Sequence, residues 1–137
     1  MSTRRPLIAG NWKMNMLRAD GVALAAGVAA KRKAEPGLAC DVLVCPPFTL
    51  ISEVAKAVEG SGVAVGGQDC HAKTSGAHTG DTAPAMLKDL GCRYVILGHS
   101  ERRTDHKETD AEVKAKAAAA HAAGLIAIIC VGETLAQ

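Results

Sequence analysis

The sequence has 137 residues, of which 48% are hydrophobic and 22% are charged, and its formal net charge is +2. This length and balance indicate one folded domain, residues 1–137, and exclude a disordered chain. The interspersed charges exclude the concentrated basic surface typical of nucleic-acid binding, and no apolar run approaches the roughly 20 residues of a membrane span.

Five short apolar runs recur along the chain, and each has the length of a strand. They are continuous rather than alternating, which is typical of strands that are buried on both faces. The predicted strands are residues 7–9, 42–45, 63–65, 94–97 and 126–131.

Four segments between these runs have the character of helices: residues 18–33, 49–59, 84–90 and 111–123. Pro84 suits the first turn of the third helix. Thr109 and Glu112 form a capping-box pattern before the fourth helix, and Gly124 is a typical stop after it.

Strands that alternate with helices predict a parallel sheet covered by helices. Two architectures fit five strands. One is an open, doubly wound sheet of the flavodoxin type, and the other is the first five-eighths of a (β/α)₈ barrel, which normally needs about 250 residues. Residues 132–137 resemble a loop turning into a further helix, so we expect the chain to be a fragment of a barrel.

Five cysteines occur at irregular spacing, and none forms a Cys-x-x-Cys pair: Cys40, Cys45, Cys70, Cys92 and Cys130. A structural zinc site or a disulfide framework is therefore not expected. The thiols are typical of small buried side chains in a reducing compartment. Because no apolar segment follows the first residues, as it would in a secretory signal, we expect a cytoplasmic protein.

Ligands of βα proteins gather at the carboxyl ends of the strands. Asn11, Lys13 and Met14 follow the first predicted strand. A lysine there can bind a phosphate or a developing oxyanion, although a solvated loop lysine is the more common case. Glycine is too sparse at this position for a phosphate-binding P-loop.

His99 follows the fourth predicted strand and begins what could be a helical turn. The positive end of such a turn disfavours an imidazolium, so the ring could donate a hydrogen bond to a carbonyl oxygen, although a structural histidine remains an alternative. Glu101 is a candidate ion-pair partner of Lys13. Arg102 and Arg103 could bind phosphate, but structural ion pairs are more common for such a doublet.

The remaining histidines and cysteines give weak signals. Cys130 follows the fifth predicted strand and shows no activating neighbour, so we expect it to pack beneath the site. His71 lies beside Cys70, but two adjacent ligands without a second pair are poor evidence for a metal. His78, His106 and His121 are expected to be surface or packing residues. We therefore predict no metal site.

Four blocks together resemble the triosephosphate isomerase family, in order and at matching separations. They are AGNWKMN (residues 9–15), SGAHTGD (75–81), GHSERR (98–103) and CVGET (130–134). The resemblance implies a (β/α)₈ barrel, of which this chain holds the first five strands and four helices. It implies interconversion of dihydroxyacetone phosphate and D-glyceraldehyde 3-phosphate in glycolysis and gluconeogenesis, without cofactor or metal.

The resemblance also implies roles for individual residues. Asn11 and Lys13 would bind the small-molecule substrate, and Lys13 would also stabilise negative charge. His99 would polarise the carbonyl and move protons between the enediolate oxygens. Glu101 would organise Lys13, and Cys130 would support the catalytic base by packing.

The loop of residues 68–81 resembles the one that crosses into a partner subunit, so the intact enzyme is expected to be a homodimer. Thr79 would lie near Asn11 of the partner subunit, and Met14 would also lie at this interface. The family usually has Thr-Gly-Glu where this chain has Thr79-Gly80-Asp81, a carboxylate one methylene shorter.

The family's catalytic glutamate, its lid and its glycine-rich phosphate loops follow the fifth strand, so residues 1–137 alone are expected to be inactive. Loss of three βα units would also leave two sheet edges open. A flavodoxin-like binding module without catalysis and a split half-barrel that serves as an assembly piece remain the alternatives.

Overall fold

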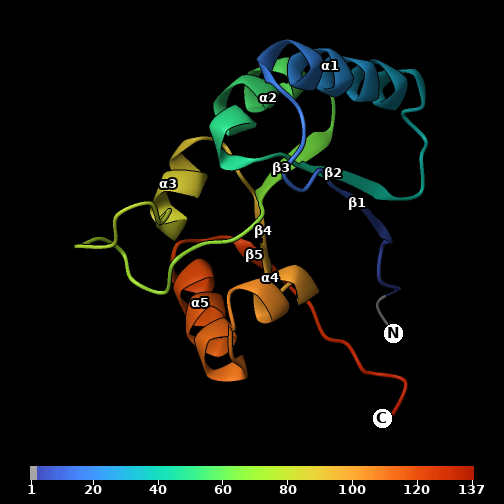
Figure 1. The fold of residues 1–137 in the computed structure, drawn as a ribbon. Coiled ribbons are helices and arrows are strands. Elements are labelled where there is room, and N and C mark those ends of the chain that lie inside the picture. Colours follow the sequence, from blue (N-terminus) through green and yellow to red (C-terminus); the bar gives the residue numbers. More distant parts are fainter. Residues whose placement is uncertain (1–2) are drawn as a thin grey trace.

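The computed structural model describes residues 3–137 and contains all five predicted strands in one parallel sheet (Figure 1). The strands are β1 (Leu7–Asn11), β2 (Asp41–Cys45), β3 (Val63–Gly67), β4 (Tyr94–Leu97) and β5 (Ile126–Ile129). Their order in the sheet is β1-β2-β3-β4-β5, the same as their order in the chain. A flavodoxin-type sheet has the order 2-1-3-4-5, so the doubly wound alternative is wrong.

The four predicted helices are present, with ends within two residues of those expected. The helical elements are α1 (Arg18–Ala34), a 3₁₀ turn η1 (Phe48–Leu50), α2 (Ile51–Val58), α3 (Pro84–Asp89), α4 (Ser100–Asp105) and α5 (Asp110–Ala122). The predicted capping box is formed, because the Thr109 side chain accepts from the Glu112 N–H and the Glu112 carboxylate accepts from the Thr109 N–H. None of the helices in residues 3–137 is long and apolar enough to cross a membrane.

The prediction of only four helices was wrong, because α4 is a separate helix of six residues. Its start is set by His99, whose ring accepts a hydrogen bond from the Glu101 N–H. So short a segment shows no apolar period of its own. The predicted second helix also begins differently, since its first turn is the 3₁₀ turn η1.

Strand ends differ from the sequence prediction because pairing with neighbours decides them. β1 continues to Asn11, which pairs with Cys45, and β3 continues to Gly67, which pairs with Val95. β5 stops at Ile129, which pairs with the last residue of β4. Cys130 therefore lies just beyond the strand.

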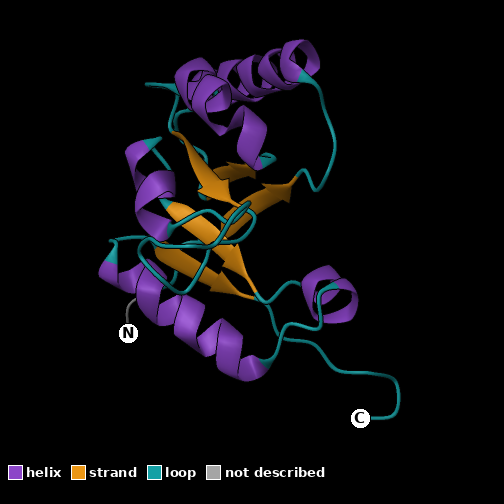
Figure 2. Cartoon of the chain, turned by 60° about the vertical axis from the view of Figure 1, so that its left-hand side comes forward, coloured by secondary structure: helices purple, strands orange, loops and turns teal. Residues whose placement is uncertain are grey.

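The sheet has helices packed against one face, as expected for a barrel wall. Residues such as Val44, Val95 and Leu97 pack with the helices in the larger core cluster. Their neighbours Leu43 and Ile96 belong to a second cluster that contains only residues of the strands and of the segment after β5. Because successive strand residues point to opposite faces, this second cluster lies on the face of the sheet away from the helices, the inner side of a half-barrel. Figure 2 shows the strands as a curved sheet with helices along its outer side.

Both edges of the sheet are open in residues 3–137, because β1 pairs only with β2 and β5 pairs only with β4. Apolar side chains along these edges reach solvent: Ile8 is 60% exposed and Ile129 is 48% exposed. Unpaired sheet edges with exposed apolar side chains favour pairing with another strand.

Candidate active site

A hollow of about 600 Å³ lies at the carboxyl ends of the strands. It is lined by Asn11, Lys13, Met14, Asn15, Gln68, Asp69, His99, Glu101, Arg102, Asp105 and His106. Asn11 is the last residue of β1, and the other residues come from the segments that follow β1, β3 and β4. Lys13 and His99, which the sequence analysis placed after two different strands, thus line one hollow.

The backbone at Lys13 has a left-handed conformation, with φ of 57°. Such a conformation costs a residue other than glycine about 1 kcal/mol or more, and surrounding contacts must maintain it. The Asn11 side-chain oxygen accepts from the Lys13 N–H at 3.0 Å. The Gln68 amide donates to the Lys13 carbonyl at 2.8 Å and to the Cys45 carbonyl at 2.9 Å. The lysine is therefore held by residues at the ends of β1 and β3.

The Lys13 ammonium lies 2.7 Å from a Glu101 carboxylate oxygen. This hydrogen bond and the nearby Lys13 charge hold the pKa of Glu101 below its ordinary value. Both side chains are about half exposed, so water screens their attraction and the pair adds little to stability. Its effect is positional, because it fixes a positive charge in the hollow.

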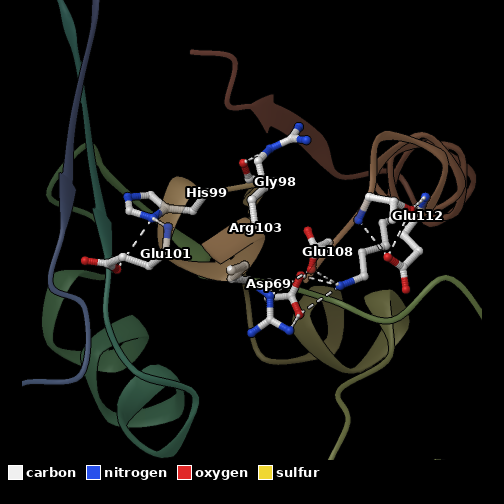
Figure 3. Close-up of polar contacts among 10 residues, drawn as sticks. Asp69, Gly98, His99, Glu101, Arg103, Glu108 and Glu112 are labelled. Carbon is white, nitrogen blue, oxygen red and sulfur yellow. Dashed lines mark hydrogen bonds and ion pairs between the residues drawn. The ribbon is translucent and has the colours of Figure 1, made fainter. Parts of the chain in front are cut away.

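Hydrogen bonding distinguishes the two ring nitrogens of His99, which lines the hollow. Its Nδ1 accepts a hydrogen bond from the Glu101 N–H at 3.2 Å, and the ring and Glu101 lie side by side (Figure 3). A nitrogen that accepts carries no hydrogen, so the hydrogen of the neutral ring is on Nε2. The Glu101 carboxylate is also 3.5 Å from Nδ1, a contact that would be an ion pair only in a protonated ring. The hydrogen bond from the Glu101 N–H is shorter than this contact, and it identifies the His99 ring as the neutral tautomer with its hydrogen on Nε2.

The two arginines after His99 form structural contacts, as the sequence analysis favoured. The Arg103 guanidinium donates to the Gly98 carbonyl at 2.7 Å and to the Cys130 carbonyl at 3.3 Å, and it pairs with Asp110 at 2.6 Å. It therefore ties the end of β4 to the segment after β5. Arg102 belongs to a second group of charges.

This second group, the charge cluster, consists of Asp69, Arg102, Glu108 and Lys116 (Figure 3 labels Asp69 and Glu108). Arg102 and Lys116 contact Glu108 at 2.9 and 2.8 Å, and they contact Asp69 at 3.1 and 3.0 Å. The Glu108 side chain is only 3% exposed. The cluster joins the end of β3 to α4 and α5 beneath the hollow.

The two carboxylates of the charge cluster share the same two cations. Burial raises the pKa of Asp69, and the hydrogen bond from Lys116 offsets only part of this effect. Burial opposes ionisation of Glu108 as well, but hydrogen bonds from Lys116 and Arg102 outweigh it and hold the pKa of Glu108 below its ordinary value. The shared cations therefore stabilise the ionised form of Glu108 more than that of Asp69, which is consistent with the shorter contacts of Glu108.

The remaining predicted site residues lie around the hollow or outside it. Met14 lines the hollow and is 94% exposed. Thr79 is exposed in the loop between β3 and α3. Cys130 is half-buried against the inner cluster, and burial raises the pKa of its thiol. A protonated thiol is a poor nucleophile, so Cys130 is suited to packing.

Sequence analysis missed the role of Gln68, which was treated only as the start of the interface loop. Gln68 directly follows β3, so the same rule that identified Lys13 and His99 could have found it. A second hollow, of about 640 Å³, lies near Gly60 and Gly91 at the opposite ends of the strands. In a half-barrel that end contributes to stability rather than to catalysis.

Comparisons with known proteins agree with this geometry. The family model described as triosephosphate isomerase matches residues 6–137. The triosephosphate isomerase of Afipia carboxidovorans is 62% identical over 97% of this chain and 52% of its own length, and that of Ruegeria pomeroyi is 60% identical over 98% and 52%. The crystal structure of triosephosphate isomerase from Bartonella henselae superposes with a TM-score of 0.84 at 45% identity, covering 97% of this chain and 54% of that one. The chain thus spans about half the length of these relatives, and it belongs to the triosephosphate isomerase family.

Proposed function

We propose that the complete protein carrying this sequence interconverts dihydroxyacetone phosphate and D-glyceraldehyde 3-phosphate, a step of glycolysis and gluconeogenesis. Membership of the family supports this function. The observation that carries it is the chain of contacts from Lys13 through Glu101 to His99 on one side of one hollow.

The reaction removes a proton beside a carbonyl group and places negative charge on the carbonyl oxygen. The Lys13 ammonium stabilises that charge because the Glu101 carboxylate fixes its position before the reaction begins. The Nε2–H of His99 donates to the same oxygen, and the ring can then carry a proton from one enediolate oxygen to the other. No cofactor or metal takes part in these steps.

Substrate binding falls to Asn11 and Lys13. The side-chain oxygen of Asn11 is occupied by the Lys13 N–H, so its amide group is the part that can donate to substrate oxygens. Glu101 and Cys130 act as positioning residues. The carbonyl of Cys130 accepts from Arg103, which links its segment to the His99 loop.

The base that removes the proton must be a group that is not already neutralised. Glu101 is paired with Lys13, and Asp69 is paired with Lys116 and Arg102. A third carboxylate of the hollow, Asp105, lies at the end of α4. Because the family's catalytic glutamate follows the fifth strand, we place the base in the part of the relatives' length that residues 1–137 do not match, and these residues alone would not support turnover.

The complete protein is further proposed to be a homodimer in the cytoplasm. The exposed position of Thr79 and Met14 fits an interface role, because both side chains are available to a second subunit. The cysteines Cys40, Cys45, Cys70, Cys92 and Cys130 are all free thiols, which fits a reducing compartment.

Steady-state kinetics of the complete protein with each triose phosphate test the proposal. Lys13→Met removes the charge and keeps the length of the side chain, so we expect kcat/KM to fall at least ~100-fold. The control is Lys33→Met, an exposed lysine in the last turn of α1, which should leave kcat/KM unchanged. A complete protein that isomerises neither substrate, or a Lys13→Met variant with wild-type kinetics, would refute the assignment.

A further inference from the structure

The loop between β3 and α3 brings together three side chains that can ligate a metal. Single ligand atoms of His71, His78 and Asp81 all lie within 4.8 Å of one another. They are separated by seven and three positions in the sequence, so they do not form a short metal-binding motif. We propose that these three residues bind one divalent transition cation of the zinc class.

Backbone hydrogen bonds hold the three residues together. The His71 N–H donates to the Thr82 carbonyl at 2.8 Å, and the Asp81 N–H donates to the His78 carbonyl at 3.0 Å. The two imidazole rings stack with their centroids 4.0 Å apart. His71 Nε2 lies 3.9 Å from an Asp81 carboxylate oxygen. The backbone therefore keeps the ligands close even though the rings do not yet converge on one point.

A small cavity of about 50 Å³ adjoins these side chains. Its wall includes His71, His78 and Asp81, and Ala83 and Met86 form its apolar side. A water molecule occupies about 30 Å³ in the liquid, so the cavity can hold a cation with one bound water.

The donor set selects the class of cation. Two imidazole nitrogens and one carboxylate oxygen suit Zn²⁺, which commonly takes three protein ligands and keeps a fourth position for water. The neighbouring Cys70 does not belong to this group of ligand atoms, and its side chain is only 1% exposed. Calcium and magnesium prefer oxygen ligands, so this site disfavours them.

Binding requires two local changes. Ligand atoms around tetrahedral zinc are roughly 3.4 Å apart, so the cluster must close by up to about 1.4 Å and the stacked rings must turn. His71 Nδ1 now accepts from the Lys73 N–H at 3.0 Å. Coordination through Nε2 moves the ring hydrogen to Nδ1, so the Lys73 amide must lose this bond when the metal binds.

The test is a calorimetric titration of the complete, chelator-treated protein with Zn²⁺ alone. We expect one saturable site per chain. His78→Gln and Asp81→Asn should each weaken binding at least ~10-fold. His121→Gln, at an exposed position of α5, is the matched control and should bind as the wild type does. Two variants at different positions are used because either could fold poorly, and the circular dichroism spectrum shows which of them is folded.

Two spectroscopic measurements separate this site from adventitious binding at a cysteine. Bound Co²⁺ should show no thiolate-to-metal charge-transfer band, and loading with Zn²⁺ should speed hydrogen exchange at the Lys73 amide. The proposal is overturned if the wild type shows no saturable binding, if folded His78→Gln and Asp81→Asn proteins both bind like the wild type, or if the thiolate band appears.

Discussion

Glu101 contacts both Lys13, which is a cation, and His99, which is a neutral hydrogen-bond donor. Its carboxylate fixes the Lys13 ammonium, and its backbone N–H sets the tautomer of His99. Sequence analysis could predict the Lys13–Glu101 pair, because the carboxyl ends of parallel strands gather at one end of the sheet, where opposite charges can meet. It could not predict the tautomer or the strained backbone at Lys13, because both depend on hydrogen bonds between atoms that the sequence does not place.

Charge sharing in the charge cluster leads to a prediction about acid stability. Glu108→Gln removes a buried carboxylate that two cations contact, so we expect the free energy of unfolding at pH 7 to fall by roughly 3 kcal/mol. The pKa of Glu108 is lowered in the folded state, so its contribution is fully present above the unfolded value of about 4.3 and is lost as the pH falls through the lower folded value. The difference between the two proteins should therefore shrink below about pH 4.

Urea denaturation of the complete protein across a pH series measures this difference. The control is Glu59→Gln, an exposed carboxylate at the end of α2, for which a change within about 0.5 kcal/mol is expected. A Glu108→Gln protein that is as stable as the wild type at pH 7 would show that the cluster contributes nothing to folding.

At the scale of elements, helices were easier to predict than strand ends. The Thr109–Glu112 capping box and Pro84 in the first turn of α3 are local signals, and both appear where the sequence placed them. The extension of β3 through Gly66 and Gly67 was missed, since glycine disfavours strands and only pairing with β4 reveals it. At His99 the sequence indicated only a possible helical turn, and the structure has the six-residue helix α4 there.

Close packing explains why β3 ends in glycine. A Cβ atom on Gly66 would lie 2.9 Å from the Cys45 sulfur and 3.0 Å from the Tyr94 carbonyl oxygen. We expect Gly66→Ala to destabilise the protein by about 1–3 kcal/mol, because backbone cannot move aside as a flexible side chain can. The measurement is the midpoint of thermal or urea denaturation.

Gly27 provides the matched control for this substitution. It is exposed in the middle of α1, and a Cβ atom there meets nothing within 4 Å. Gly27→Ala should stabilise by up to about 1 kcal/mol, because alanine favours helix. If Gly66→Ala and Gly27→Ala change the stability in the same direction, packing against β4 is not the reason for glycine at position 66.

At the scale of the whole molecule, the sequence could predict five parallel strands. Its pattern of strands and helices alone could not decide between a doubly wound sheet and part of a barrel. The sequential strand order and the helices on one face decide for the half-barrel. Side chains in the inner cluster, such as Leu43 and Ile96, are buried although β1 and β5 remain open edges. The half-barrel thus has a core of its own, and it also has surface that favours further association.

The isolated 137-residue polypeptide is expected to show no isomerase activity above background, because the family's catalytic glutamate follows the fifth strand and the carboxylates of Glu101 and Asp69 in the hollow are already paired. Its open edges should also make it self-associate, which light scattering can measure. Turnover well above background, or a well-folded monomer at high concentration, would count against this account.

The most direct measurement is the incorporation of solvent deuterium into dihydroxyacetone phosphate, followed by NMR with the complete protein in heavy water. It reports removal of the proton beside the carbonyl, which is the event that Lys13 and His99 are proposed to assist. The account predicts rapid incorporation by the wild type and a rate at least ~100-fold lower for His99→Gln. Absence of exchange in the wild type, or equal exchange in His99→Gln, would contradict it.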